Sequence, residues 1–121
     1  MNIPIVLVTK MSTQPESTDV IQGTLDLLIL RSLSLQPMHG FGITQRIEQI
    51  SKGVFKVNPG SLLLAFQRLE RAGYIDAEWR TTENNRRGKY YRITEKGRRQ
   101  LKTETRDWET RVAAISRLLE A

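Results

Sequence analysis

Cations and tyrosines crowd into the middle of this sequence, in the stretch ENNRRGKYYRIT at residues 83–94. Arg86, Arg87 and Lys89 carry the guanidinium and ammonium donors that bind phosphate oxygens. Gly88 stands between them and admits a tight turn, so a projecting and adaptable element can present these cations. The chemistry that this stretch predicts is contact with an anionic partner.

The positive charge is confined to one part of the chain. The net charge is +6, and residues 80–102 hold nine Lys/Arg and two Asp/Glu, a local excess of +7. The segments before and after it are close to neutral. A localised excess is typical of a contact with nucleic acid or another anionic surface. From charge alone, a solvated basic helix end explains it equally well.

Other chemistries have little support in the composition. The chain has no cysteine and one histidine, His39, which leaves no set of residues for a thiol, Cys-zinc or His-rich metal site. No phosphate-cradling glycine loop and no nucleophile elbow occur. We therefore expect neither an enzyme nor a bound cofactor or metal.

The N-terminus adds little to this prediction. Its apolar run at residues 3–8 is interrupted by Pro4 and is too short to cross a membrane, so we expect a cytoplasmic protein without a membrane partner. The polar stretch that follows predicts a disordered extension over residues 1–17. Met11 is an alternative start to Met1.

The first expected helix covers residues 18–35, capped by Thr18 or Asp19. It is apolar on more than one face, which suggests that a partner chain covers part of it through Leu25 and Leu28. A second helix is expected over about 40–51, with four inward residues: Phe41, Ile43, Ile47 and Ile50.

A third helix follows Asn58, which caps it, with Pro59 at its first position and Gly73 after its end. Its buried stripe consists of Leu62, Ala65, Phe66 and Leu69. Next, YIDAEWR alternates with Ile75, Ala77 and Trp79 on one face, which predicts a half-buried strand. KYYRIT is the expected return strand of a hairpin, with Tyr91 and Ile93 on its inner face.

The last expected helix begins at Thr94 and reaches the C-terminus. Apolar residues in it follow 4-3-4-3-4 spacing, a coiled-coil seam formed by Leu101, Thr105, Trp108, Val112, Ile115 and Leu119. Since a small domain cannot bury such a seam well, the pattern predicts pairing with a second subunit. The alternative is that the helix folds back on its own domain.

Three helices followed by a hairpin are the order of a winged helix-turn-helix. The expected fold class is mainly α (α+β), with a two-stranded wing and a long C-terminal dimerisation helix. Residues 1–17 form the extension, residues 18–94 the DNA-binding domain and residues 95–121 the dimerisation helix. In this fold the third helix enters the major groove and basic wing residues contact phosphates.

Four segments carry a family resemblance: GTLDLLILRSL, PMHGFGITQRI, GSLLLAFQRLERAGYI and NNRRGKYYRITEKGRRQL. Over residues 23–121 the chain resembles the short form of the PadR family of transcriptional regulators. The resemblance implies a dimeric winged-helix protein, usually a repressor. It assigns DNA contact to seven positions, which are Ser61, Gln67, Arg68, Arg86, Arg87, Lys89 and Tyr90.

The third helix departs from the family pattern. Leu63 and Leu64 replace the usual Tyr and Pro, and Phe41 replaces a Tyr in the second helix. Leu63 cannot donate a hydrogen bond to phosphate, and both leucines lie off the buried stripe. This departure keeps open the alternative of a protein-interaction or ligand-sensing module with weak DNA binding.

Trp108 matches a tryptophan that some short relatives use to stack planar ligands between two subunits. The resemblance therefore implies a small hydrophobic or planar effector at this position, whereas the alternative is a packed interface without a pore. The combined expectation is a homodimeric repressor that reads a near-palindromic site in double-stranded DNA, and that such an effector can release.

Overall fold

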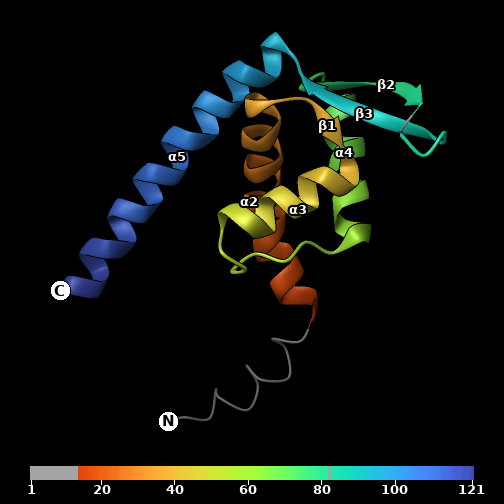
Figure 1. Ribbon diagram of the computed structural model, residues 1–121. Coiled ribbons are helices and arrows are strands. Elements are labelled where there is room, and N and C mark those ends of the chain that lie inside the picture. Colours follow the sequence, from red (N-terminus) through yellow and green to blue (C-terminus); the bar gives the residue numbers. More distant parts are fainter. Residues whose placement is uncertain (1–13, 82) are drawn as a thin grey trace.

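The computed structural model describes residues 14–81 and 83–121, and for residues 14–23 it describes the backbone alone. Within the described residues, four helices form the body of the domain and a small antiparallel sheet lies at its edge, as Figure 1 shows. In chain order the elements are α2 (Gln14–Leu35), β1 (Met38–His39), α3 (Gly40–Ile50), α4 (Pro59–Arg71), β2 (Ile75–Thr81), β3 (Arg87–Ile93) and α5 (Glu95–Glu120). None of these helices is long and apolar enough to cross a membrane, within the described part of the chain.

Helix α2 begins at Gln14, earlier than the start predicted at Thr18 or Asp19. Pro15 stands in its first turn, where a residue without an N–H costs no hydrogen bond. The extension expected over residues 1–17 therefore overlaps α2 in its last four residues, and its first thirteen lie outside the described residues.

Helix α2 lies in the middle of the core and touches α3, α4, β3 and α5 of its own chain. Its apolar faces are buried by these neighbours, and Leu25 is 1% exposed. The prediction that Leu25 contacts a partner chain was wrong, because its side chain has no free surface. Leu28 is partly buried against the same core.

Helix α4 forms as its sequence predicts. The side-chain oxygen of Asn58 accepts from the backbone N–H of Gly60 at 2.7 Å and of Ser61 at 3.2 Å, with Pro59 as the first helical residue. All four residues of the predicted stripe are buried. Gly73 ends the helix with φ +81°, a left-handed conformation that glycine adopts without strain.

Helix α3 is buried along a narrower stripe than predicted. Ile43 and Ile47 are buried, but Phe41 is 73% exposed and Ile50 is also exposed, so the inward assignment of these two was wrong. Phe41 lies two residues before Ile43, on nearly the opposite side of the helix. Ile50 is the last helical residue, and the loop that follows leaves it uncovered.

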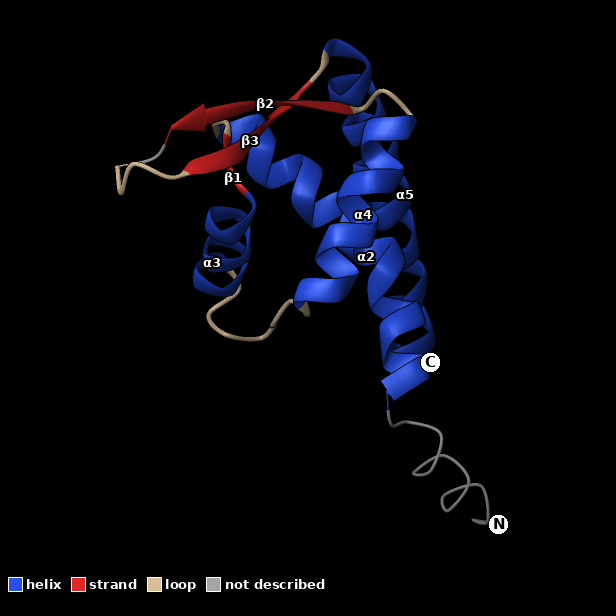
Figure 2. Cartoon of the chain, turned by 90° about the vertical axis from the view of Figure 1, so that its right-hand side faces the viewer, coloured by secondary structure: helices blue, strands red, loops and turns tan. Residues whose placement is uncertain are grey.

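The predicted two-stranded wing forms from β2 and β3, and the short strand β1 adds to it, so the antiparallel sheet has the order β1-β3-β2. Tyr91 of β3 pairs with Met38 on one side and Ala77 on the other. A two-residue strand such as β1 leaves no periodic pattern in a sequence. β2 and β3 extend beyond the helices (Figure 2), so Trp79 is exposed although its alternation predicted an inward side chain.

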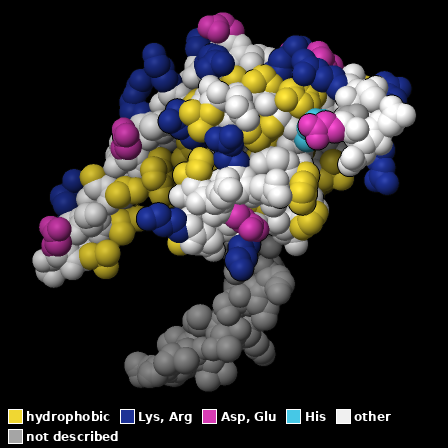
Figure 3. Space-filling view, in the orientation of Figure 1, with side chains coloured by type: hydrophobic (Ala, Val, Ile, Leu, Met, Phe, Trp, Pro, Cys, Tyr) yellow, Lys and Arg dark blue, Asp and Glu magenta, His cyan; other side chains and the backbone are white. Residues whose placement is uncertain are grey.

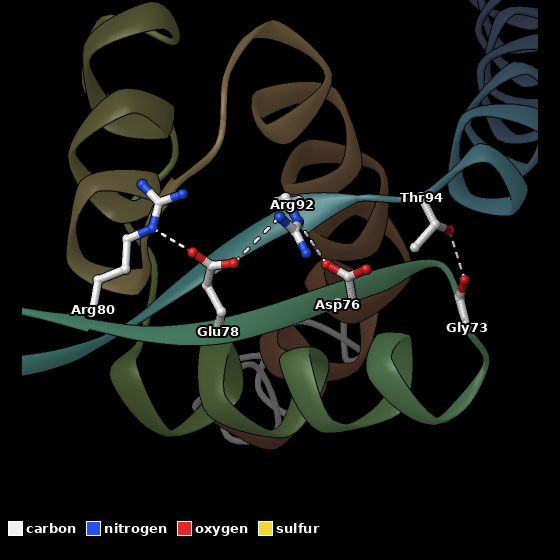
Figure 4. A network of polar contacts seen from close by, with 6 residues as sticks. All are labelled: Gly73, Asp76, Glu78, Arg80, Arg92 and Thr94. Atoms are coloured by element: carbon white, nitrogen blue, oxygen red, sulfur yellow. Dashed lines mark hydrogen bonds and ion pairs between the residues drawn. The ribbon is translucent and has the colours of Figure 1, made fainter.

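Helix α5 starts where the wing ends. The hydroxyl of Thr94 caps it by accepting from the Gly97 N–H at 3.0 Å, and donates to the Gly73 carbonyl at 2.6 Å (Figure 4). The first turns of α5 pack against α2 and β3, and its C-terminal half then leaves the body of the domain (Figure 1).

Candidate nucleic-acid interface

The outward face of α4 is the surface that a major groove would meet. Opposite the buried stripe, exposed residues recur with helical spacing at Gly60, Leu64, Gln67 and Arg71. Gln67 is exposed on this face, and its contact with a base stays a prediction. Its amide can donate and accept at once, as adenine N6 and N7 demand. Arg71 lies on the same stripe and was missed by sequence reasoning.

Arg68 is positioned differently from the prediction. Its guanidinium donates to the Asp26 carboxylate of α2 at 2.7 Å, so it joins two helices of the core. Burial raises the pKa of Asp26, and the hydrogen bond and charge of Arg68 oppose that rise. Ser61 lies on the same flank of α4 and is partly buried. These two residues lie on a flank of α4, between its buried stripe and its outward face.

Arg86 and Arg87 lie at the exposed tip of the wing, beside Asn85, whose φ of 63° makes the turn. The Arg87 guanidinium lies over the Trp79 ring at 5.5 Å from its centroid. This contact explains why Trp79 can stand exposed, because its ring supports a cation at the wing. This contact holds the Arg87 guanidinium against one face of the hairpin.

Lys89 connects the wing to α4. Its ammonium group lies 3.3 Å from the Glu70 carboxylate and 5.7 Å from the centre of the Tyr91 ring. Glu70 follows Gln67 by three residues on α4, so the base of the wing and the outward face of α4 belong to one continuous surface. A carboxylate partner offsets part of the charge that Lys89 could offer to phosphate.

Tyr90 is enclosed by its neighbours on the other face of the sheet. Its ring meets His39 edge-on at 4.6 Å between centroids, and the Arg80 guanidinium lies 4.3 Å from the ring centre. His39 therefore packs against the sheet through this contact with Tyr90. Tyr91 is buried and stacks on Phe66 of α4 at 4.1 Å, which anchors β3 to the core.

Carboxylates of β2 neutralise two further cations of the basic segment. As Figure 4 shows, Arg92 donates to Asp76 at 2.9 Å and to Glu78 at 3.3 Å, and Arg80 also donates to Glu78. The hydrogen bond from Arg80, with its charge, lowers the pKa of Glu78, and Asp76 raises the pKa of Arg92. Charge counting along the sequence missed these pairs because the acids come from outside residues 80–102.

The seam of α5 is largely uncovered. Leu101 packs against the core, but Trp108, Val112, Ile115 and Leu119 are exposed. Figure 3 shows hydrophobic side chains gathered along this arm of the molecule. The alternative that α5 folds back on its own domain therefore holds for its first turns and not for the rest of the seam.

Trp108 borders a hollow of about 500 Å³ between α2 and α5. Three carboxylates, those of Asp26, Glu104 and Asp107, line the same hollow. Asp26 is also the partner of Arg68, so this hollow and α4 share one ionised side chain. The sequence singled out Trp108 and places Glu104 and Asp107 beside it on the same helix, but it gave no signal for Asp26, which is distant in the chain.

A comparison with protein families shows which family the chain belongs to. The sequence pattern of the transcriptional regulator PadR-like family matches residues 29–103. The chain belongs to the PadR-like family. That match includes the candidate DNA-contact residues of α4 and the wing, and it ends before Trp108.

Two individual relatives resemble this PadR-like protein over most of its length. A solved transcriptional regulator from Clostridium thermocellum is 32% identical and superposes with a TM-score of 0.75, covering 82% of this chain and 96% of that one. A Lysinibacillus sphaericus protein called uncharacterized protein X is 33% identical over 91 residues, which are 75% of this chain and 84% of that protein.

A third relative shares the fold at lower identity. The PadR-like transcriptional regulator of Bacillus cereus is 22% identical, with a TM-score of 0.72, and covers 85% of this chain and 98% of its own. The two solved relatives are both named transcriptional regulators, and both share the fold of this PadR-like protein.

Proposed function

We propose that this PadR-like protein is a dimeric, DNA-binding repressor that reads a near-palindromic operator with α4 and the basic wing. One observation carries the proposal. The Lys89–Glu70 ion pair ties the base of the wing to α4 and makes one surface of the two elements. That surface combines Gln67 and Arg71 for base edges with Arg86 and Arg87 for phosphates.

The exposed seam of α5 supports the dimer. A second copy of the chain presents the same apolar seam, and two such helices can cover each other as a coiled coil. A twofold dimer would then place two α4 helices about one DNA turn apart, roughly 34–36 Å, which matches a near-palindromic site.

The hollow beside Trp108 supports a small-molecule effector. A planar ligand can stack on the indole ring, and a hydrophobic one can fill the space between α2 and α5. In the proposed mechanism, ligand binding there alters the packing of α2 against α5, which changes the separation of the two DNA-reading helices and releases the operator.

Charge reversal at the wing tip tests DNA binding. We compare Arg86→Glu/Arg87→Glu with Arg106→Glu/Arg117→Glu, a change of equal charge at exposed positions of α5 outside the seam. Lys89 is left intact because a glutamate there would face Glu70. Circular dichroism checks that both variants are folded.

The readout is the affinity for duplex DNA selected from a random pool, measured by fluorescence anisotropy at several salt concentrations. For ~6–10 phosphate contacts, the wild-type affinity should fall by roughly 10³–10⁵ between 50 and 200 mM salt. The wing variant should bind far more weakly, with a salt slope smaller by about 3–4 if each of four arginines in the dimer contacts one phosphate. Salt-independent binding, or equal loss in the α5 variant, would instead favour a protein-interaction or ligand-sensing module.

A further inference from the structure

The outward surface of α4 is apolar at its centre. Leu63 and Leu64 are 54% and 53% exposed, although neither contributes to the buried stripe. Leu63 and Phe41 of α3 line an apolar hollow of about 480 Å³ together with Lys89 of β3. Exposed apolar side chains next to a basic wing need a partner that is itself apolar and surrounded by negative charge.

Duplex DNA offers such a partner at one chemical group. Among the base edges in the major groove, the C5-methyl of thymine is the apolar feature, and it lies between two phosphate backbones. Leucine has no hydrogen-bond donor or acceptor, so its contribution to sequence readout is limited to apolar contact of this kind.

The positions of the leucines on α4 fit this partner. Leu64 shares the outward stripe with Gln67 and Arg71, one and two turns further along the helix. Leu63 lies on the flank toward the wing, on the side of Glu70 and its partner Lys89. A helix inserted along this stripe therefore places a methyl-seeking side chain next to an amide that suits adenine.

We propose that Leu63 and Leu64 are specificity-determining residues that read thymine C5-methyl groups in the major groove. This inference rests on the proposed DNA-binding function and adds the chemical group that α4 recognises. It predicts operator half-sites that contain one or two essential thymines, with an adenine for Gln67 next to them.

A protein partner is the competing occupant of the patch. Stable protein interfaces cover roughly 800 Å² on each partner, with about 20–30 residues a side. The large exposed apolar side chains here are those of Leu63, Leu64 and Phe41, and Lys89 of the wing lines the hollow beside them. The small apolar area and the basic surroundings favour DNA.

Removing single methyl groups from DNA tests the inference. The wild-type protein first selects duplexes from a random pool, and each thymine of the selected half-site is then replaced in turn by deoxyuridine. This replacement deletes the methyl and keeps every hydrogen-bonding group. Burial of one methyl corresponds to about a fourfold change in affinity, so one or two positions per half-site should each lose roughly three- to fivefold.

Leu63→Ala and Leu64→Ala complete the test. Each variant should bind thymine DNA more weakly, and each should lose the deoxyuridine effect at its own position. Leu35→Ala is the matched control, because Leu35 is a similarly exposed leucine at the end of α2. It should keep both the affinity and the deoxyuridine effect. Circular dichroism confirms the fold of each variant.

The outcomes separate this inference from the function on which it rests. Salt-dependent binding that deoxyuridine does not weaken would overturn the methyl readout and leave the proposed repressor intact. Undiminished DNA binding by both alanine variants would also overturn it, and would assign the patch to a protein partner. If the wild-type protein enriches no DNA from the pool, both the function and the inference are wrong.

Discussion

Val112→Asp is the sharpest test of whether α5 joins two chains. Val112 lies in the middle of the exposed seam, between Trp108 and Ile115, and is 41% exposed in the single chain. A carboxylate at this position can remain hydrated in a monomer. In a dimer packed along the seam, it would be enclosed by apolar side chains of both chains.

The magnitude follows from this exposure. Burying a carboxylate without a partner costs at least about 1–3 kcal/mol. Burying the 41% of the valine side chain that is exposed contributes about 1 kcal/mol, which the variant forgoes. Both chains of the dimer carry the change, so the loss is about 4–8 kcal/mol. At 1.4 kcal/mol for each tenfold change, the dissociation constant should rise at least about a thousandfold.

Sedimentation equilibrium over a wide concentration range measures this constant. Val54→Asp is the control, because it makes the same chemical change at an exposed valine in the loop between α3 and α4. We expect the control to dimerise like the wild type and Val112→Asp to be monomeric and folded. Equal dissociation constants for all three proteins, or a wild type that is monomeric throughout, would refute dimerisation through the seam.

Two further predictions concern the internal structure. Gly97→Ala should lower the free energy of unfolding by about 1–3 kcal/mol or more, because the added Cβ would clash with the Tyr74 carbonyl oxygen. Gly42→Ala is the control and should have little effect, because its added Cβ meets only ordinary van der Waals contacts. Thermal unfolding compares the two variants. Arg68→Met should cost about 1–3 kcal/mol at pH 7, because the partly buried Asp26 carboxylate then loses its hydrogen-bond and charge partner. Burial raises the pKa of Asp26, so its ionisation opposes folding. The stability that Arg68→Met loses should therefore shrink as the pH falls toward about 4. Urea unfolding at several pH values measures it, and a loss that grows in acid would contradict the reasoning.

Local patterns predicted the elements that depend on neighbouring residues. Asn58 followed by Pro59 predicted the start of α4, and Gly73 predicted its end, because caps are made by side chains and backbone a few residues apart. Thr94 predicted the start of α5 for the same reason. The start of α2 was predicted less well: the helix begins at Gln14 and not at Thr18 or Asp19, because several residues in this segment can serve as an N-cap or first-turn residue.

Contacts between distant segments were the source of the errors. Leu25 was assigned to a partner chain because the sequence does not show that α3, α4 and α5 all cover α2. Arg68 was assigned to DNA because its acidic partner, Asp26, is 42 residues away in the chain. Phe41 was assigned to the core because it is apolar, but the rest of the chain covers only the side of α3 that carries Ile43 and Ile47.

The sequence by itself determined the order of the elements, the buried stripe of α4, the basic wing and the seam of α5. Each of these features depends on the spacing of residues within one segment, because helices and strands repeat with a fixed period along the chain. The tertiary structure alone decided that Lys89 and Arg92 pair with carboxylates, because Glu70, Asp76 and Glu78 approach the basic segment from outside it. It also placed Leu63 beside Lys89 of the wing, which the spacing of residues within α4 does not show.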